Sequence, residues 1–204
     1  MRVLPSRYVL LGVAATLLAA CAQTPPIVIS KDTITSTGTG QNVSMRGRPV
    51  ALSGNSLKVG DKLPAISVTG TNMAAVDLAV NPGKVRVMSI VPSLDTATCD
   101  EQTHQLGEAV QGLDQVEVFT LSMDLPFAQR RYASVAKISN VTFLSDYRNA
   151  SFGNSTGLLQ PSRLLARGVM VVDKQNVIRH MQIVPDMSME PDMKEADRVA
   201  RTLL

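Results

Sequence analysis

Cysteine, histidine and aromatic residues are all scarce in this chain of 204 residues. It has two cysteines, two histidines and no tryptophan, and aromatic side chains make up 3% of it. Because Cys21 and Cys99 lie far apart, a Cys-x-x-Cys dithiol oxidoreductase is excluded, and no zinc-ligand spacing is present. A glycine-rich phosphate-binding loop is also lacking. We therefore expect neither a metal nor a cofactor.

The sequence also lacks a hydrophobic run long enough to span a bilayer. Its one uncharged, largely apolar stretch, Tyr8 to Ala20, has 13 residues, whereas a transmembrane helix needs about 20. With Arg2 and Arg7 before it, the stretch fits the apolar core of a signal peptide.

The end of this stretch, Leu-Ala-Ala-Cys, resembles a bacterial lipobox, in which the chain is cut before the cysteine and the cysteine is acylated. We expect residues 1–20 to be a lipoprotein signal peptide and Cys21 to be the lipid anchor of an exported lipoprotein. The anchor would hold the protein on the outer membrane facing the periplasm, or at the cell surface. An ordinary signal peptide that precedes a cysteine is the alternative.

Excess positive charge is largely confined to the N-terminus. The whole chain has a net charge of +3 and a pI near 9.0. Removal of residues 1–20 takes away Arg2 and Arg7 and no acidic residue, which leaves a net charge of about +1. Nucleic-acid binding needs a clustered basic surface, so no nucleic-acid partner is expected.

Composition divides the rest of the chain into two parts. Residues 21–42 are rich in Thr, Ser, Gly and Pro, which predicts an acylated cysteine followed by a flexible linker. Residues 43–204 are enough for one domain with a substantial core.

Within residues 43–204 the apolar residues alternate between strand and helix periods. A hairpin is predicted to turn at residues 46–48, a buried strand at 84–93 is followed by a helix, and a strand–helix–strand unit covers 116–146. A loop then runs to 165, two strands lie within 168–184, and a helix closes the chain. The pattern predicts an α/β domain of thioredoxin-like type, with a central mixed sheet flanked by helices and an N-terminal hairpin.

The stretch "PSLDTATC", residues 92–99, places Cys99 where the first helix begins. Asp95, Thr96 and Thr98 are all good N-cap residues, and Thr98 with Glu101 fits a capping box. Backbone N–H groups in a first helical turn stabilise a thiolate. The neighbouring carboxylates oppose this, so a reactive thiolate needs a cation from elsewhere in the fold. The alternative is that Cys99 is a small buried apolar residue.

The stretch "PSLDTATC" resembles the active-site loop of peroxiredoxins, Pro-x-x-x-Thr/Ser-x-x-Cys, and its Ser-x-Asp-Thr form resembles bacterial thiol peroxidases, the atypical two-cysteine peroxiredoxins. The resemblance covers about residues 43–204. It continues through "DLPFAQ" (124–129), "YRNASFG" (147–153), "LLARGVMVVDKQNVI" (164–178) and "MEPD" (189–192).

The resemblance implies a role for each of four residues. Cys99 would be the peroxidatic thiolate, and Arg167 would supply the missing cation and hydrogen-bond the peroxide. Thr96 would hold the peroxide through its hydroxyl, and Pro92 would shield the sulfur from water. Two other arginines, Arg148 and Arg163, are the nearest competitors for the cationic role.

The chain departs from the family at the resolving cysteine, whose position falls on Ala133. With Cys21 acylated, Cys99 has no thiol partner in its own chain. Either an external thiol of unknown identity reduces it in a one-cysteine cycle, or two subunits cross-link through Cys99, or turnover has been lost. The family also implies a homodimer.

The function expected is therefore that of a membrane-tethered, thiol-dependent peroxidase that reduces hydrogen peroxide and organic hydroperoxides. The alternative is a non-catalytic thioredoxin-like lipoprotein on a retired peroxidase scaffold.

Overall fold

The structure is a computed structural model, and it describes residues 28–80 and 83–204. Its first regular element is the predicted hairpin, in which β1 (Asn42–Met45) pairs antiparallel with β2 (Arg48–Ala51). Arg46 and Gly47 form the turn, both with positive φ (51° and 77°). Two positive φ values are what a two-residue hairpin turn requires.

A mixed sheet of seven strands forms the centre of the molecule, with the spatial order β4-β3-β7-β6-β5-β8-β9. The central strands β5, β6 and β7 run parallel, and the remaining pairs are antiparallel. The strands are β3 (Ser67–Gly70), β4 (Ala75–Asp77), β5 (Val85–Ile90), β6 (Val116–Ser122), β7 (Thr142–Ser145), β8 (Gly168–Val172) and β9 (Ile178–Ile183).

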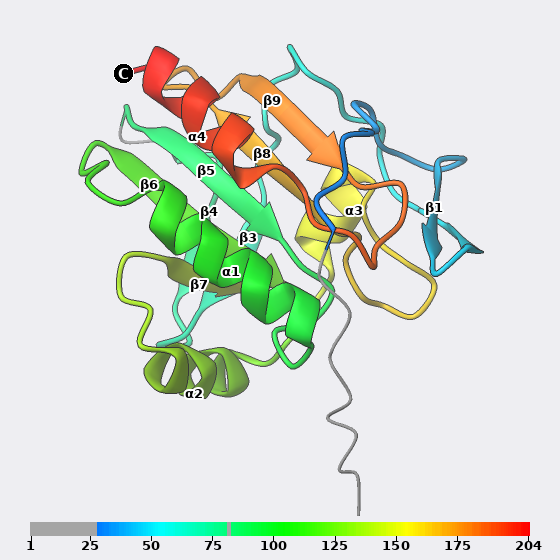
Figure 1. The fold of residues 1–204 in the computed structure, drawn as a ribbon, viewed down its shortest axis with the longest axis horizontal. Helices are drawn as coiled ribbons and strands as arrows, with labels where there is room; N and C mark the ends of the chain where they lie inside the picture. Colours follow the sequence, from blue (N-terminus) through cyan, green and yellow to red (C-terminus); the bar gives the residue numbers. More distant parts are fainter. Residues whose placement is uncertain (1–27, 81–82) are drawn as a thin grey trace, which may run out of the picture.

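Within the described residues four helices flank this sheet, and Figure 1 shows α1 and α4 lying side by side across one face of it. They are α1 (Ala97–Ala109), α2 (Pro126–Ala136), α3 (Ser151–Thr156) and α4 (Met193–Thr202). The short α3 lies within the stretch predicted to be a loop. With a mixed sheet, flanking helices and a separate N-terminal hairpin, the predicted α/β architecture is confirmed.

The sheet has one hydrophobic core on each face, and β5 contributes to both. Val85 and Val87 pack with α1 and α4, whereas Met88 and Ile90 pack with α3 and the hairpin side. All six β5 residues are buried, so the strand that leads to the "PSLDTATC" loop is fixed from both sides. This explains why four of its six residues are apolar, with only Arg86 and Ser89 polar.

The predicted flexible linker differs from the structure over its second half. Residues 28–37, here called the strap, are hydrogen-bonded along the domain. Ile34 exchanges backbone hydrogen bonds with Ile183 in β9, and the Thr37 N–H donates to the Leu57 carbonyl. Ser30 and Thr37 are buried. Hydrogen bonds to the domain therefore hold the strap in place, although its Thr- and Ser-rich composition is typical of a flexible segment.

The β9–α4 loop, residues 184–192, is tied to the hairpin through Asp186. The Asp186 carboxylate accepts hydrogen bonds from the Ser44 hydroxyl and from the backbone N–H groups of Arg46 and Gly47. These donors and Ser188 hold the pKa of Asp186 well below its usual range, against the opposing effect of burial. The loop is therefore fixed at its middle.

The predicted signal peptide and Cys21 lie outside the described residues. Among the residues that are described, none of the helices combines the length and apolar character needed to cross a membrane.

Candidate active site

Cys99 lies in the first turn of α1, directly after the carboxyl end of β5. Thr96 is the N-cap residue, and the Cys99 N–H donates to its carbonyl at 3.0 Å. The predicted Thr98–Glu101 capping box is wrong, because the helix begins two residues earlier than that box requires. The Cys99 side chain is fully buried within the core between α1, α4 and the sheet.

The predicted cation reaches this sulfur. An Nη2–Sγ distance of 3.2 Å joins Arg167 to Cys99, and the guanidinium is 98% buried. Its other donors are also satisfied, since Nη1 donates to Gln102 Oε1 at 2.7 Å and Nε donates to the Met187 carbonyl at 2.8 Å. Three acceptors in one plane fix the orientation that a planar guanidinium needs. A fixed positive charge against the sulfur stabilises its thiolate form.

Gln102 positions Arg167, and the sequence reasoning did not assign it. Its amide nitrogen donates to the Ser89 hydroxyl at 2.7 Å and to the Gly168 carbonyl at 3.2 Å. This turns the amide oxygen toward the guanidinium. The signal that could have found it is its spacing, because a residue three positions after Cys99 lies on the same helix face.

Thr96 and Pro92 lie on the loop that leads into α1. The Thr96 side chain is exposed, and its hydroxyl donates to the Ser93 carbonyl at 3.2 Å. Pro92 is buried, next to Val91 at the end of the strand. The structure therefore brings Cys99 and Arg167 into contact and places Thr96 at the helix start, with its hydroxyl bonded to the loop itself.

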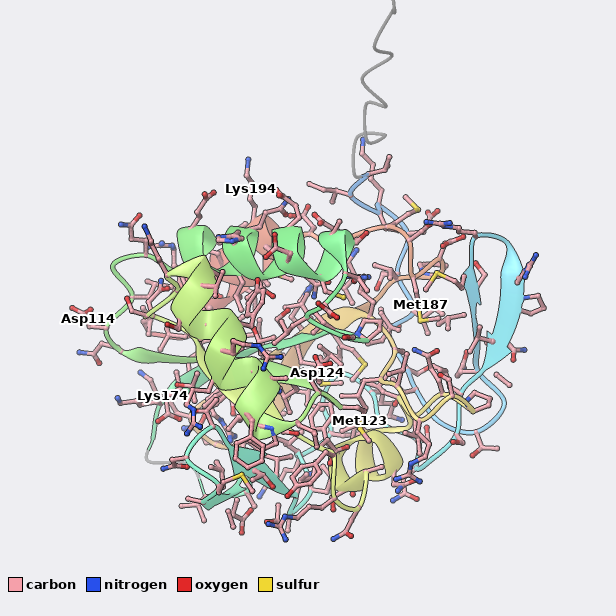
Figure 2. All side chains as sticks on the ribbon, turned by 90° about the horizontal axis from the view of Figure 1, so that it is seen from below. Asp114, Met123, Asp124, Lys174, Met187 and Lys194 are labelled. Atoms are coloured by element: carbon pink, nitrogen blue, oxygen red, sulfur yellow. The ribbon has the colours of Figure 1, made fainter. Side chains whose placement is uncertain are left out.

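Asp124 holds this loop to the neighbouring strand. Its carboxylate accepts hydrogen bonds from the Ser93 hydroxyl (2.7 Å), the Leu94 N–H (2.8 Å) and the Ser122 hydroxyl (2.8 Å). Figure 2 views this side of the molecule, with α1 and α2 toward the reader and Asp124 labelled near the centre. Asp124 opens the "DLPFAQ" stretch, so the residue that defines this part of the motif shapes the cysteine loop.

The carboxylate next to Cys99 has its own partners. Asp100 accepts a hydrogen bond from the Tyr132 hydroxyl at 2.7 Å, and burial together with this carboxylate raises the pKa of Tyr132. His104 lies 3.7 Å from Asp100 on the exposed side of α1. Arg148 and Arg163, the competitors for the cationic role, are exposed at the surface.

A second ionisable group near Arg167 was also missed. Glu190, in the β9–α4 loop, is completely buried, and its carboxyl oxygens accept no hydrogen bond of normal geometry from the described residues, although the Gln105 amide lies near enough to favour the ionised form. Its pKa is raised to about 7, because burial and the nearby Glu101 carboxylate disfavour the charged form more than Arg167 and Gln105 favour it. The "MEPD" stretch carries no local signal that would place its glutamate near an arginine 23 positions earlier in the sequence.

Ala133, which stands at the position expected for the family's resolving cysteine, lies on α2 and packs partly buried against the core that contains Cys99. Cys99 is the one cysteine that the structure describes, and it is a free thiol. Over the same residues, no group of three or more His, Cys, Asp or Glu side chains gathers as a metal site would.

The family model described as Redoxin matches residues 58–199 of this chain. Two curated thiol peroxidases are similar over most of the chain. The one from Halalkalibacterium halodurans is 40% identical over 164 residues, covering 80% of this chain and 99% of that protein. The one from Streptococcus pneumoniae strain R6 is 42% identical over 162 residues, covering 79% and 99%.

Solved structures give the same result for the fold. A peroxiredoxin-like protein from Aquifex aeolicus matches with a TM-score of 0.77 at 34% identity, covering 82% of this chain and 99% of that one. A thiol peroxidase from Chromobacterium violaceum matches with a TM-score of 0.73 at 15% identity, covering 80% and 97%, which supports the fold alone.

Proposed function

Because the chain belongs to the Redoxin family and, within it, to the bacterial thiol peroxidases, we propose that it reduces hydrogen peroxide and organic hydroperoxides through Cys99 alone. It is a peroxiredoxin-type oxidoreductase, and the proposal concerns its substrates and its single-cysteine cycle. The observation that carries it is the 3.2 Å contact between Arg167 Nη2 and Cys99 Sγ in a buried site.

In the first step the Cys99 thiolate attacks the terminal peroxide oxygen. An S–O bond forms as the O–O bond breaks, so that the sulfur is oxidised to a sulfenic acid and the peroxide is reduced to an alkoxide or hydroxide, which takes up one proton. Arg167 contacts the sulfur. As negative charge moves from the sulfur to the leaving oxygen, the fixed guanidinium stabilises that charge without having to reorient. Thr96 and Pro92 complete the site in this proposal, by holding the peroxide and excluding water.

In the second step an external thiol closes the cycle. It attacks the sulfenic sulfur and releases water, which leaves a mixed disulfide with Cys99. A second external thiol then reduces that disulfide to the Cys99 thiol and forms its own disulfide. Ala133 supports this route, because the chain has no cysteine there to form the bond internally.

Burial of Cys99 adds a condition to the second step. A thiol reductant is larger than a peroxide, and the Cys99 side chain is fully buried. The first turn of α1 must therefore open before the reductant can reach the sulfur. The Thr96 side chain makes no capping bond to the helix, so this turn lacks one of the contacts that usually hold a helix start.

We also propose that Cys21 carries a lipid anchor. The described part of the strap begins at Val28, which is seven residues after Cys21 and therefore at most about 25 Å from it when the chain is fully extended. The active site would then work close to a lipid surface, where organic hydroperoxides arise. The lipid anchor would therefore lie closer to the domain than a flexible linker over all of residues 21–42 would allow.

We propose that the chain forms a homodimer through α2, so that its partner is a second copy of itself. Leu125, Phe127 and Val135 are each at least half exposed on or beside this helix. Large exposed apolar side chains favour association, and a second copy is the partner that the family resemblance implies. Sedimentation of wild type and Phe127→Glu tests this, since the variant should be monomeric at a concentration where wild type is dimeric.

The test of the function uses one equivalent of cumene hydroperoxide and a sulfenic-acid reagent. We expect one label per chain in the wild type and none in Cys99→Ser. Without added thiol the protein should consume one equivalent of peroxide, and with a small dithiol it should turn over repeatedly. Consumption of one equivalent with no turnover in dithiol would contradict the one-cysteine cycle.

A further inference from the structure

Glu190 is a buried acid that the peroxidase chemistry described above does not use. Its side chain has no exposed surface, and its carboxyl oxygens accept no hydrogen bond of normal geometry from the described residues, with the Gln105 amide as the nearest polar group that favours its ionised form. A buried carboxyl group in this state carries a substantial desolvation cost. Such a weakly satisfied group in a folded protein calls for an explanation.

The strap is what covers this residue. The Glu190 N–H donates to the Val28 carbonyl at 3.0 Å, and the Ser30 N–H donates to the Glu190 carbonyl at 2.7 Å. Both backbone groups of Glu190 are therefore held by the segment that leads from the N-terminus. Ile29, between these two residues, lines the adjacent cavity together with Glu101 and Gln105 of α1.

The same loop also holds the active-site arginine. The Met187 carbonyl, three residues before Glu190, accepts the hydrogen bond from Arg167 Nε at 2.8 Å, and Met187 is labelled beside this loop in Figure 2. Arg167 thus contacts Cys99 on one side and the Glu190 loop on the other. A negative charge at Glu190 would attract this guanidinium, whose position and charge both serve the sulfur.

Few ionisable groups face Glu190. Glu101 on α1 repels its carboxylate and Arg167 attracts it, with the Cys99 sulfur beyond the guanidinium. The strap residues that cover it, Val28–Ser30, carry no ionisable side chain. Asp192, in the same loop, accepts the capping hydrogen bond from the Glu195 N–H at the start of α4.

We propose that Glu190 is a positioning residue for Arg167. While Glu190 is neutral, the guanidinium stays against Cys99. Once Glu190 ionises, its carboxylate attracts the guanidinium and weakens the interaction with Cys99. Only the kinetic part of this proposal, the rate of Cys99 oxidation, rests on the proposed peroxidase function. The raised pKa of Glu190, about 7, places this change within the physiological range. Above neutral pH, attack on peroxide becomes slower because less positive charge remains for the leaving oxygen.

The first test follows the Glu190 carboxyl without any peroxide. In protein labelled with ¹³C at the glutamate carboxyl carbon, the signal absent from Glu190→Gln is assigned to Glu190 and titrated by NMR. We expect a midpoint near pH 7 that moves lower in Cys99→Ser, because the thiolate no longer competes for Arg167. A midpoint in the ordinary range of a glutamate, or one that Cys99→Ser leaves unchanged, would overturn the proposal.

The second test measures the rate constant for Cys99 oxidation by hydrogen peroxide as a function of pH. Wild type should slow by about three- to tenfold between pH 6.5 and 8.5, the size expected for one partly screened buried charge. Glu190→Gln, which has the shape of the neutral acid, should match wild type at pH 6 and lack the decline. Glu108→Gln, an exposed position further along α1, is the matched control and should keep the wild-type profile.

The two tests separate this proposal from the function it builds on. Equal pH profiles for wild type and Glu190→Gln would overturn the role of Glu190. If wild type reacts no faster than free cysteine at any pH, the peroxidase function fails, and the carboxyl titration decides the coupling between Glu190 and Cys99.

Discussion

At the scale of single residues, the site is a chain of hydrogen bonds that ends at one sulfur. Ser89 and Gly168 orient Gln102, Gln102 and Met187 orient Arg167, and Arg167 contacts Cys99. Each link is a buried polar group with a partner, which is what makes such a network rigid. Glu190, a buried acid whose carboxyl oxygens accept no hydrogen bond of normal geometry from the described residues, is not part of this chain of bonds.

Glu190 gives a prediction for stability. Its pKa is about 7 in the folded protein and near 4.5 when unperturbed. The stability that its neutral form contributes is fully present below pH 4.5 and is lost as the pH rises to 7, because in that window only the folded state holds the proton. Relative to Glu190→Gln, wild type should lose on the order of 2 to 3 kcal/mol between pH 4.5 and pH 7.5.

Urea unfolding of both proteins across this range measures the difference. Two stability curves that stay parallel from pH 4.5 to 7.5 would show that Glu190 has an ordinary acidity in the folded protein.

At the scale of elements, the sequence predicted the parts of the site that follow from local pattern. The apolar run of β5 and the helix that begins just before Cys99 follow from local pattern. The pairing of Cys99 with Arg167, directly before β8, follows from the family resemblance, and their 3.2 Å contact agrees with it. The short α3 was missed because its six residues, "SFGNST", contain no helical repeat of apolar side chains.

Other parts of the site could not be predicted, for physical reasons. Gln102, Asp124 and Glu190 act through contacts with residues far away in the sequence, and periodicity carries no information about such contacts. The strap was read as a flexible linker because its composition is polar, and only its pairing with β9 and the β9–α4 loop orders it.

The loop before α1 gives the prediction at this scale. Asp124→Asn removes one of the acceptor oxygens that the Ser93 hydroxyl, the Leu94 N–H and the Ser122 hydroxyl share. We expect a loss of about 1–3 kcal/mol in unfolding free energy, together with slower oxidation of Cys99. Asp95→Asn, an exposed change in the same loop, should stay within about 0.5 kcal/mol of wild type. Equal urea midpoints for both variants would show that Asp124 does not hold the loop.

At the scale of the whole molecule, the fold brings the strap and the loop that holds Arg167 together. The strap enters from Val28, covers Glu190 and continues to the edge strand β9 (Figure 1). The segment that would bear the lipid therefore pairs with the same loop that holds Arg167. Curated relatives match this chain over about four fifths of its length and nearly all of their own, so about a fifth of this chain has no counterpart in them.

The anchor gives the prediction for the whole molecule. Cys21→Ala removes the acylated sulfur, so the exported protein should move from the membrane fraction to the soluble fraction, where immunoblotting detects it. Its rate of Cys99 oxidation should not change, since the site lies entirely within residues 28–204. Retention of the processed Cys21→Ala protein in membranes would show that something other than a lipid at Cys21 holds it there.

The central claim is that Arg167 makes the buried Cys99 thiolate a peroxide-reducing nucleophile. Stopped-flow measurement of the reaction with hydrogen peroxide at pH 6.5 tests it most directly, on wild type, Cys99→Ser and Arg167→Met. We predict that wild type reacts orders of magnitude faster than free cysteine and that Cys99→Ser does not react. Arg167→Met should lose about 10²–10³-fold while keeping its fold by circular dichroism, as expected for removal of a charge that stabilises the transition state. A wild-type rate equal to that of free cysteine, or an Arg167→Met rate equal to that of wild type, would contradict the account.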